Sequence, residues 1–134
     1  MIQGVGVDLI SIERIRRLYQ RFPDRFLKRI FSDRELQHFL NQKFSAASLA
    51  ARFAAKEAVL KAIGCGIGPA ALKDVEIIAT PGKQPRVELH GEAYRLAGSK
   101  NITAIAVSLT HEPPFASAIA AACTGPVTDY DSSL

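Results

Sequence analysis

Long hydrophobic runs are missing from this sequence, and cysteine is scarce. No apolar stretch approaches the roughly 20 residues that a membrane-spanning helix needs. The apolar start of the chain is interrupted by Asp8 and lacks the basic residues that open a signal peptide. The two cysteines, Cys65 and Cys123, lie far apart in the chain and lack the spacing of metal ligands. We therefore expect a cytoplasmic protein with free thiols, and we exclude membrane proteins and disulfide-rich secreted domains.

The length and composition are those of one globular domain. The chain has 134 residues, of which 48% are hydrophobic and 22% are charged, so it can bury a substantial core. No repeat or linker divides it. We expect residues 1–123 to form a single domain and residues 124–134, which are mostly polar and include Asp129 and Asp131, to form a frayed tail.

Acidic residues are rare in one segment near the start of the chain. Residues 11–31 hold seven basic and two acidic side chains, a charge of +5 in a protein whose net charge is +4. Arg14, Arg17 and Arg21 recur on one side of an expected helix, with Leu18 among them. This pattern is typical either of a solvated basic face or of a docking surface for an acidic partner, with Leu18 as its apolar anchor.

A nucleic-acid-binding module is the alternative reading of the same basic segment. Aromatic residues make up 7% of the chain, and none lies between the arginines as a stacking platform would. We therefore expect the partner to be neither a nucleic acid nor a membrane.

The central feature is a helix expected over residues 46–63, where alanine dominates and nearly every residue is a strong helix former. Ser45 supplies an N-cap oxygen, and Gly64 can adopt the left-handed conformation past the end. Apolar residues occur on more than one side, which predicts a largely buried helix. It nevertheless carries four charged residues: Arg52, Lys56, Glu57 and Lys61. Burying an unpaired charge is costly, so these are either ordinary helix-surface pairs or parts of a site for an anion and a cation.

The remaining pattern predicts an α+β fold. Strands are expected over residues 2–10, 75–80, 86–89, 102–110 and 115–123, and further helices over 11–22, 24–30, 33–40 and 92–97. The last two strands, joined by a tight connection at 111–114, should be antiparallel. We expect a mostly antiparallel sheet packed by the long buried helix and the shorter helices on one face.

Two carboxylates from buried elements suggest metal chemistry. Asp8 near the end of the first strand and Glu57 on the central helix offer the oxygen ligands that suit Mg²⁺, although Asp8 can equally serve as a helix-entry cap. Lys61, one turn after Glu57, can reach the phosphates of a bound substrate. Gly64 and Gly66 would let backbone N–H groups approach an anion. No lysine and hydroxyl residue follow these glycines, so this is not a P-loop.

The same segments carry a family resemblance. GVGVDLISIERI at 4–15, FSDRE at 31–35, RFAAKEA at 52–58, KAIGCGI at 61–67 and SLTH at 108–111 occur in order over residues 2–123. Together they resemble the short 4′-phosphopantetheinyl transferases of the holo-acyl-carrier-protein synthase type. One departure is Cys65, where the family usually has threonine between the glycines, so a role for this side chain is not expected.

The resemblance implies an activity in fatty acid biosynthesis and assigns roles residue by residue. The implied reaction transfers 4′-phosphopantetheine from coenzyme A to a serine of acyl carrier protein, with Mg²⁺ as cofactor, in a homotrimer whose active sites lie between subunits. Asp8 and Glu57 match the metal ligands, and Lys61 matches the lysine near the transferred phosphate. The positions that match the coenzyme A site are Arg52, Lys61, Gly64, Gly66, Ser108 and His111. The expected docking surface for acidic carrier protein consists of Arg14, Arg17, Leu18, Arg21, Arg25 and Lys28. The base that takes the serine proton stays open between Glu57 and His111.

Overall fold

The computed structural model describes residues 1–40, 45–65 and 71–125. In chain order the elements are β1 (Ile2–Ser11), α1 (Ile12–Arg21), α2 (Pro23–Ile30), α3 (Asp33–Leu40), α4 (Ala46–Ala62), the 3₁₀ turn η1 (Leu72–Asp74), β2 (Val75–Ile78), β3 (Arg86–Leu89), α5 (Gly91–Ser99), β4 (Ile102–Glu112) and β5 (Phe115–Thr124). Every strand pairing is antiparallel, in a three-stranded sheet of order β1-β5-β4 and a separate β2–β3 pair. The α+β prediction is therefore confirmed. No helix in these described parts is long and apolar enough to span a membrane.

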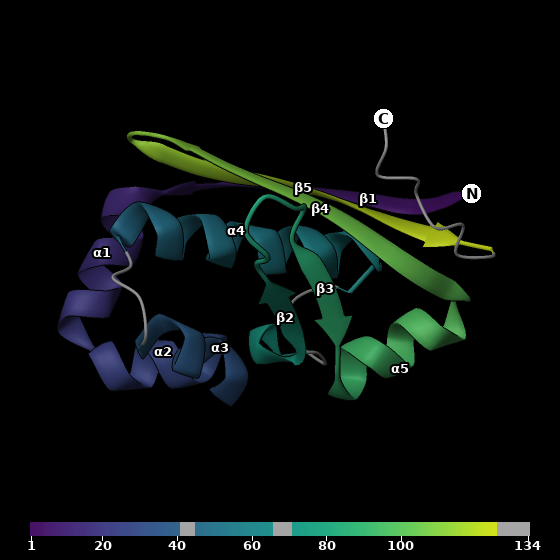
Figure 1. Cartoon of the computed structure of the whole chain (residues 1–134), viewed down its shortest axis with the longest axis horizontal. Coiled ribbons are helices and arrows are strands. Elements are labelled where there is room, and N and C mark those ends of the chain that lie inside the picture. The colour runs from purple at the N-terminus through teal and green to yellow at the C-terminus, as the bar shows by residue number, and fades with distance from the viewer. Residues whose placement is uncertain (41–44, 66–70, 126–134) are drawn as a thin grey trace.

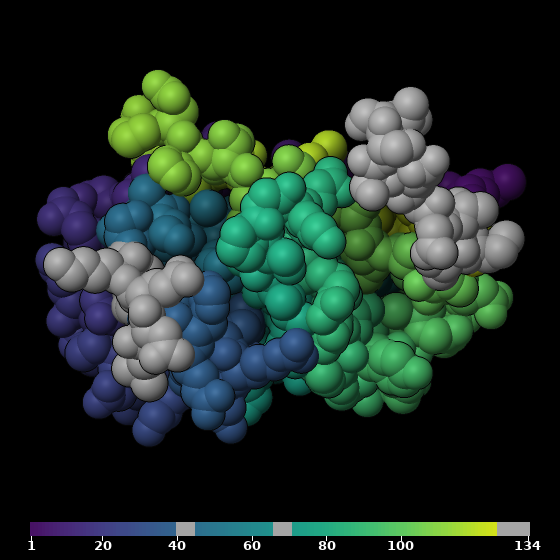
Figure 2. Space-filling view, viewed as in Figure 1, coloured from purple at the N-terminus to yellow at the C-terminus, as the bar shows by residue number. Residues whose placement is uncertain are grey.

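The helix α4 lies between the two groups of elements. The three-stranded sheet packs along one side of it, and the shorter helices and the β2–β3 pair lie on the other (Figure 1). Figure 2 shows the β2–β3 pair at the surface between the α2–α3 region and α5. The predicted caps are present. Ser45 Oγ accepts a hydrogen bond from the Ser48 N–H at 3.1 Å, and Gly64 has a φ of +76°.

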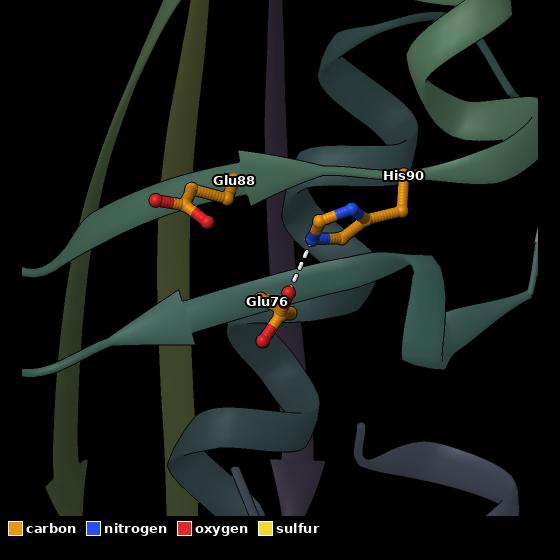
Figure 3. Close-up of side chains that lie close together, drawn as sticks. All are labelled: Glu76, Glu88 and His90. Atoms are coloured by element: carbon orange, nitrogen blue, oxygen red, sulfur yellow. Dashed lines mark ion pairs between the residues drawn. The ribbon is translucent and has the colours of Figure 1, made fainter. Parts of the chain in front are cut away.

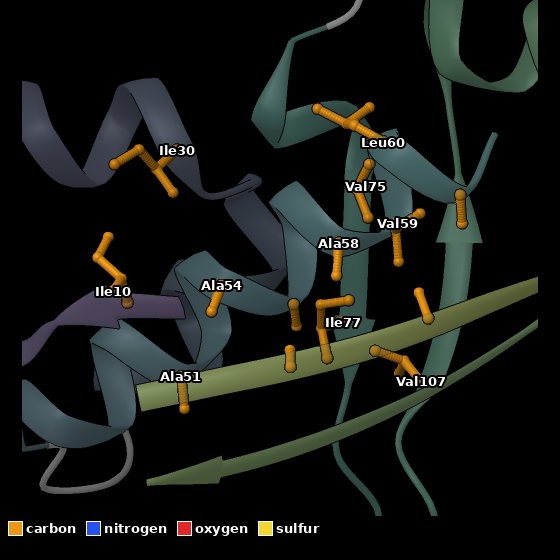
Figure 4. Close-up of a cluster of buried hydrophobic side chains, with 14 of the residues drawn as sticks. Ile10, Ile30, Ala51, Ala54, Ala58, Val59, Leu60, Val75, Ile77 and Val107 are labelled. Carbon is orange, nitrogen blue, oxygen red and sulfur yellow. The ribbon is translucent and has the colours of Figure 1, made fainter. Parts of the chain in front are cut away.

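Small residues allow α4 to approach the sheet closely. A Cβ atom on Gly6 would lie 1.9 Å from the carbonyl oxygen of Ala58, and one on Gly4 would lie 2.1 Å from that of Ala62. The inward face of β5 is built from buried alanines, namely Ala116, Ala118, Ala120 and Ala122. Figure 4 shows the part of this core where α4 meets the strands. The small side chains therefore set the distance between α4 and β1, and with it the position of any group that β1 points toward the helix.

The outward face of the same sheet is apolar and exposed. The exposed fractions of Val5, Val7 and Leu9 are 57%, 59% and 63%, and that of Ile119 on β5 is 52%. The period of two along β1 thus turns its glycines, Asp8 and the buried Ile10 toward α4, and it turns Val5, Val7 and Leu9 away from the core. Contiguous exposed apolar surface of this kind is typical of an interaction site.

Four expectations about local structure were wrong in detail. The helix expected over 11–22 is shorter: α1 ends at Arg21, and Phe22 leaves the helical conformation and is 42% exposed. The helix expected at 92–97 continues through Gly98 to Ser99. The strand expected to end at Thr110 continues to Glu112, because β4 and β5 stay paired up to the Pro113–Pro114 turn. The strand at 75–80 is shorter and ends at Ile78, where its pairing with Arg86 ends. Of the predicted tail, Thr124 belongs to β5, and residues 126–134 lie outside the described residues.

Candidate active site

Asp8 and Lys61 meet at the contact between β1 and α4. Lys61 Nζ lies 3.2 Å from Asp8 Oδ1 and also donates a hydrogen bond to the Val7 carbonyl oxygen at 2.9 Å. The Asp8 side chain is 18% exposed, whereas that of Lys61 is 52% exposed. Asp8 is therefore anchored at the edge of the core, and the lysine ammonium faces solvent beside it. The helix-entry cap is supplied by Ser11, whose Oγ accepts a hydrogen bond from the Arg14 N–H, so Asp8 is not needed for that role.

Glu57 is the second carboxylate at this contact. Partial burial raises its pKa above the ordinary value, the charge of Asp8 raises it further, and Lys61 opposes both. Two carboxylates that repel each other in a half-buried position form a favourable environment for a divalent cation, because a cation removes the repulsion. Two carboxylates fit the oxygen ligands that a hard ion such as Mg²⁺ takes, and their role as its ligands stays a prediction.

Arg52 and Lys56 lie on a different side of α4 and bind other parts of the same chain. Lys56 is fully buried, and its Nζ lies 2.6 Å from Glu35 Oε1. Arg52 Nη1 donates a hydrogen bond to the Ile77 carbonyl oxygen at 3.1 Å, and its guanidinium lies over the ring of Phe39. The four charges of α4 are therefore divided between two clusters. Ser32 and Glu35 form a capping box at the start of α3, and nothing in the sequence indicates that Glu35, 21 residues away, is the partner of Lys56.

The first backbone N–H groups of the turn after α4 donate hydrogen bonds to carbonyl oxygens of the helix itself. The Gly64 N–H donates to the Lys61 carbonyl oxygen at 3.0 Å, and the Cys65 N–H donates to that of Leu60 at 2.8 Å. These two N–H groups therefore close the end of the helix instead of pointing toward a ligand. Gly66, the other glycine predicted to contact coenzyme A, lies outside the described residues.

Ser108 and His111 are both exposed on β4 but lie on opposite faces of the sheet. Ser108 is in register with Ile119 on the outward face, whereas His111 is in register with the buried Ala116. An odd separation along a strand places side chains on opposite sides. The two residues therefore do not line one surface of a single chain.

The predicted docking residues lie on α1 and α2. This set, Arg14, Arg17, Leu18, Arg21, Arg25 and Lys28, is exposed throughout. Beside it lies an apolar groove of about 500 Å³, whose lining includes Leu18, Phe22, Phe26 and Phe53. The guanidinium groups of Arg21 and Arg25 lie 5.2 and 5.7 Å from the centroid of the Phe22 ring. The surface thus combines cations with an apolar depression.

A second cluster of possible metal ligands lies on the β2–β3 pair. Ligand atoms of Glu76, Glu88 and His90 all lie within 4.8 Å of one another (Figure 3). These groups already have partners, because Ser32 Oγ donates to Glu76 at 2.9 Å, His90 Nε2 contacts Glu76, and Arg34 pairs with Glu88 at 3.0 Å. The ligand atoms of this cluster thus already make polar contacts within the chain. Sequence reasoning missed it, although the alternation along β3 places Glu88 and His90 on one face.

Comparisons with known proteins point to the same chemistry. Residues 4–117 match the family model of the 4′-phosphopantetheinyl transferase superfamily. The holo-[acyl-carrier-protein] synthase of Moorella thermoacetica is 45% identical over 115 residues, which span 86% of this chain and 89% of that protein. The crystal structure of the holo-ACP-synthase of Plasmodium yoelii has a TM-score of 0.84 and 30% identity, covering 94% of this chain and 98% of that one. A Helicobacter pylori holo-[acyl-carrier-protein] synthase in complex with coenzyme A has a TM-score of 0.75 and 32% identity, with coverages of 89% and 99%.

Proposed function

This chain belongs to the 4′-phosphopantetheinyl transferase superfamily, and we propose that the group formed by Asp8, Glu57 and Lys61 carries out its reaction. The reaction is that of a holo-[acyl-carrier-protein] synthase: 4′-phosphopantetheine moves from coenzyme A to a serine hydroxyl of apo acyl carrier protein. The leaving product is adenosine 3′,5′-bisphosphate. The observation that carries the assignment is the meeting of two carboxylates and a lysine from β1 and α4, which are distant in sequence.

Asp8 and Glu57 would hold Mg²⁺, and Lys61 would contact the transferred phosphate. When bound by these carboxylates, Mg²⁺ would supply positive charge that offsets the negative charge of the pyrophosphate. Lys61 is suited to its role because its ammonium is half-exposed beside Asp8, where it can turn toward a phosphate oxygen. The serine proton goes to Glu57 or to His111. The raised pKa of Glu57 makes it a stronger base than an ordinary carboxylate. A bound cation would lower this pKa and weaken the base.

The coenzyme A site is formed between copies of the chain, and the assembly is a homotrimer. Arg52 binds Ile77 on another side of α4 from Glu57, and Ser108 and His111 lie on opposite faces of the sheet. A second copy would let all three contact one coenzyme A molecule. The exposed apolar face of β1 supports such an interface. Light scattering should show a trimer that Val7→Glu dissociates, whereas the equally exposed Tyr94→Glu on α5 should leave it intact. A monomeric parent chain would contradict the shared site.

Acidic acyl carrier protein docks on the basic surface of α1 and α2. The exposed arginines complement a negative partner, and the groove beside Leu18 and Phe22 offers an apolar contact at the same place. Cys65 and Cys123 are not joined in a disulfide bond, which agrees with a reducing cytoplasm as the site of action.

Mass spectrometry of the carrier protein tests this function. Incubation with coenzyme A, Mg²⁺ and apo carrier protein should add the mass of one phosphopantetheine group to the acceptor. Glu57→Gln should reduce the rate about 100-fold or more while the thermal unfolding curve stays cooperative. The matched control is Glu92→Gln, which removes an exposed carboxylate that pairs with Arg95 on α5. Failure of the parent chain to modify any of a range of carrier proteins would refute the assignment.

A further inference from the structure

Lys100 occupies the space above the glycine that follows α4. Its Nζ donates a hydrogen bond to the Ile63 carbonyl oxygen at 2.7 Å. A Cβ atom on Gly64 would lie 2.2 Å from the same Nζ, so the ammonium fills the position of a side chain at residue 64. The backbone of Lys100 is itself fixed, because its N–H donates to the Ala97 carbonyl oxygen at 3.1 Å at the end of α5. A lysine from a distant segment is thus built into the turn that ends α4.

This turn lacks a favourable environment for an anion unless a side chain provides it. The C-terminus of an α-helix carries a partial negative charge, which repels a phosphate. The N–H groups of Gly64 and Cys65 are already donated to the carbonyl oxygens of α4. Lys61 in the last turn of the helix is engaged with Asp8. Lys100 therefore contributes positive charge to the glycine turn beyond that of Lys61.

We propose that Lys100 is a coenzyme A-binding residue whose ammonium holds a phosphate of the co-substrate at the turn after α4. The inference rests on the proposed function and on the family resemblance, which matches Gly64 to a position of the coenzyme A site. An ammonium has three N–H donors, and the bond to Ile63 uses one of them. The same bond fixes the direction of the lysine side chain, so little rotamer entropy is lost when a phosphate binds.

A merely structural role for Lys100 predicts different behaviour. A lysine that only caps the helix contributes stability by satisfying the Ile63 carbonyl oxygen. Lys100→Gln keeps an amide N–H that can donate to this oxygen but removes the charge, and Lys100→Arg keeps the charge. If the charge binds phosphate, Lys100→Gln should raise KM for coenzyme A roughly tenfold, with kcat changed less than about twofold. Lys100→Arg should restore most of the loss.

The experiment compares steady-state kinetics and thermal unfolding of the full-length variants. Lys83→Gln is the matched control, because it removes an exposed lysine in the turn between β2 and β3, and its KM should equal that of the parent chain. Titration calorimetry with coenzyme A repeats the comparison without turnover. An unchanged KM and affinity in Lys100→Gln, with or without a lower Tm, would overturn the proposal and leave Lys100 as a helix cap. An inactive parent chain would instead refute the function itself.

Discussion

Lys56 Nζ lies 2.6 Å from Glu35 Oε1 in the interior of the protein, where the two side chains are 0% and 2% exposed. The ammonium also bonds to the carbonyl oxygens of Leu72, at 3.2 Å, and Val75. Burial lowers the pKa of Lys56, and the charge of Glu35 opposes this shift. The pair joins α4 to α3 and β2 directly next to Glu57. The buried charges therefore fix the rotation of the helix that presents the candidate metal ligand.

Breaking this pair should destabilise the fold strongly. Lys56→Met leaves the Glu35 carboxylate buried without its cation, and we expect a loss of about 3–5 kcal/mol in the free energy of unfolding. Replacing both residues, as in Lys56→Met with Glu35→Leu, should recover much of that loss because the unpaired Glu35 carboxylate is removed as well. Urea unfolding of the single and double variants measures the coupling between them.

The matched control for the buried pair is an exposed one. Glu92→Gln breaks the contact with Arg95, whose Nη2 lies 2.8 Å from Glu92 Oε2 on the surface of α5. This change should leave the urea midpoint within experimental error, since exposed pairs are screened by water. A similar small effect of Lys56→Met would contradict the structural role of the buried pair.

Enlarging Gly6 should separate β1 from α4. The added methyl of Gly6→Ala would meet the Ala58 carbonyl oxygen at 1.9 Å, and a backbone atom can move away only if the helix shifts. We expect a loss of about 1–3 kcal/mol in stability and a weaker metal affinity, because Asp8 and Glu57 move apart. Differential scanning calorimetry and Mg²⁺ titration test both effects.

Gly98→Ala is the control: no atom lies within 4 Å of the added Cβ, and the helix α5 should gain up to about 1 kcal/mol.

The sequence was sufficient to predict which segments form the strands and the helices, although several of their ends differ. That Asp8 and Glu57 bind a metal stays a prediction. Local periodicity sets the α4 helix and the alternation of β1, so Asp8 could be placed on the side of Gly6 without coordinates. The division of the α4 charges was harder to predict. Lys56 and Glu57 are adjacent, yet Lys56 is buried against Glu35, whereas the charge of Asp8 raises the pKa of Glu57. Which partner each finds depends on α3, β1 and β2, whose positions around α4 are set by packing between segments distant in sequence.

Lys100 and Phe22 show that contacts and side-chain directions at the ends of helices are also hard to predict from the sequence. The bond from Lys100 to Ile63 joins residues 37 apart, and no spacing rule relates them. Phe22 has the helical phase of Ile15 but follows the last residue of α1, so its side chain leaves the core. Helix ends are fixed by their caps and by the next element, and periodicity does not report either.

Metal affinity should depend on pH through Glu57. Its raised pKa means that the metal-free folded protein keeps a proton on Glu57 above the ordinary pKa of 4.5, and a cation must displace that proton. The Kd for Mg²⁺ should therefore fall as pH rises through the raised pKa, by at most about tenfold per pH unit, and then become constant. Calorimetric titration from about pH 5 to pH 8 measures this profile.

Two variants separate the causes of this pH dependence. Asp8→Asn removes the neighbouring charge that raises the Glu57 pKa, so the remaining profile should shift to lower pH. Glu57→Gln should abolish this proton-linked component. An elevated carboxyl pKa makes the metal-free protein less stable as pH rises, because the folded state binds a proton that the unfolded state has already released. Glu57→Gln should remove this loss of stability. A pH-independent Kd in the parent chain would exclude Glu57 as a ligand.

Reversing charge on the docking surface should weaken carrier-protein binding and leave the chemistry intact. Arg14→Glu and Arg21→Glu place repulsive charge where an acidic partner approaches, and each should raise KM for carrier protein roughly tenfold with little change in kcat or in KM for coenzyme A. Added salt should raise KM for the parent chain and reduce the difference between parent and variants, because exposed charges are screened. Lys83→Glu makes the same charge change in the turn between β2 and β3 and should be neutral. Equal KM values for Arg14→Glu, Arg21→Glu and Lys83→Glu would mean that only net charge matters and that the carrier protein docks elsewhere.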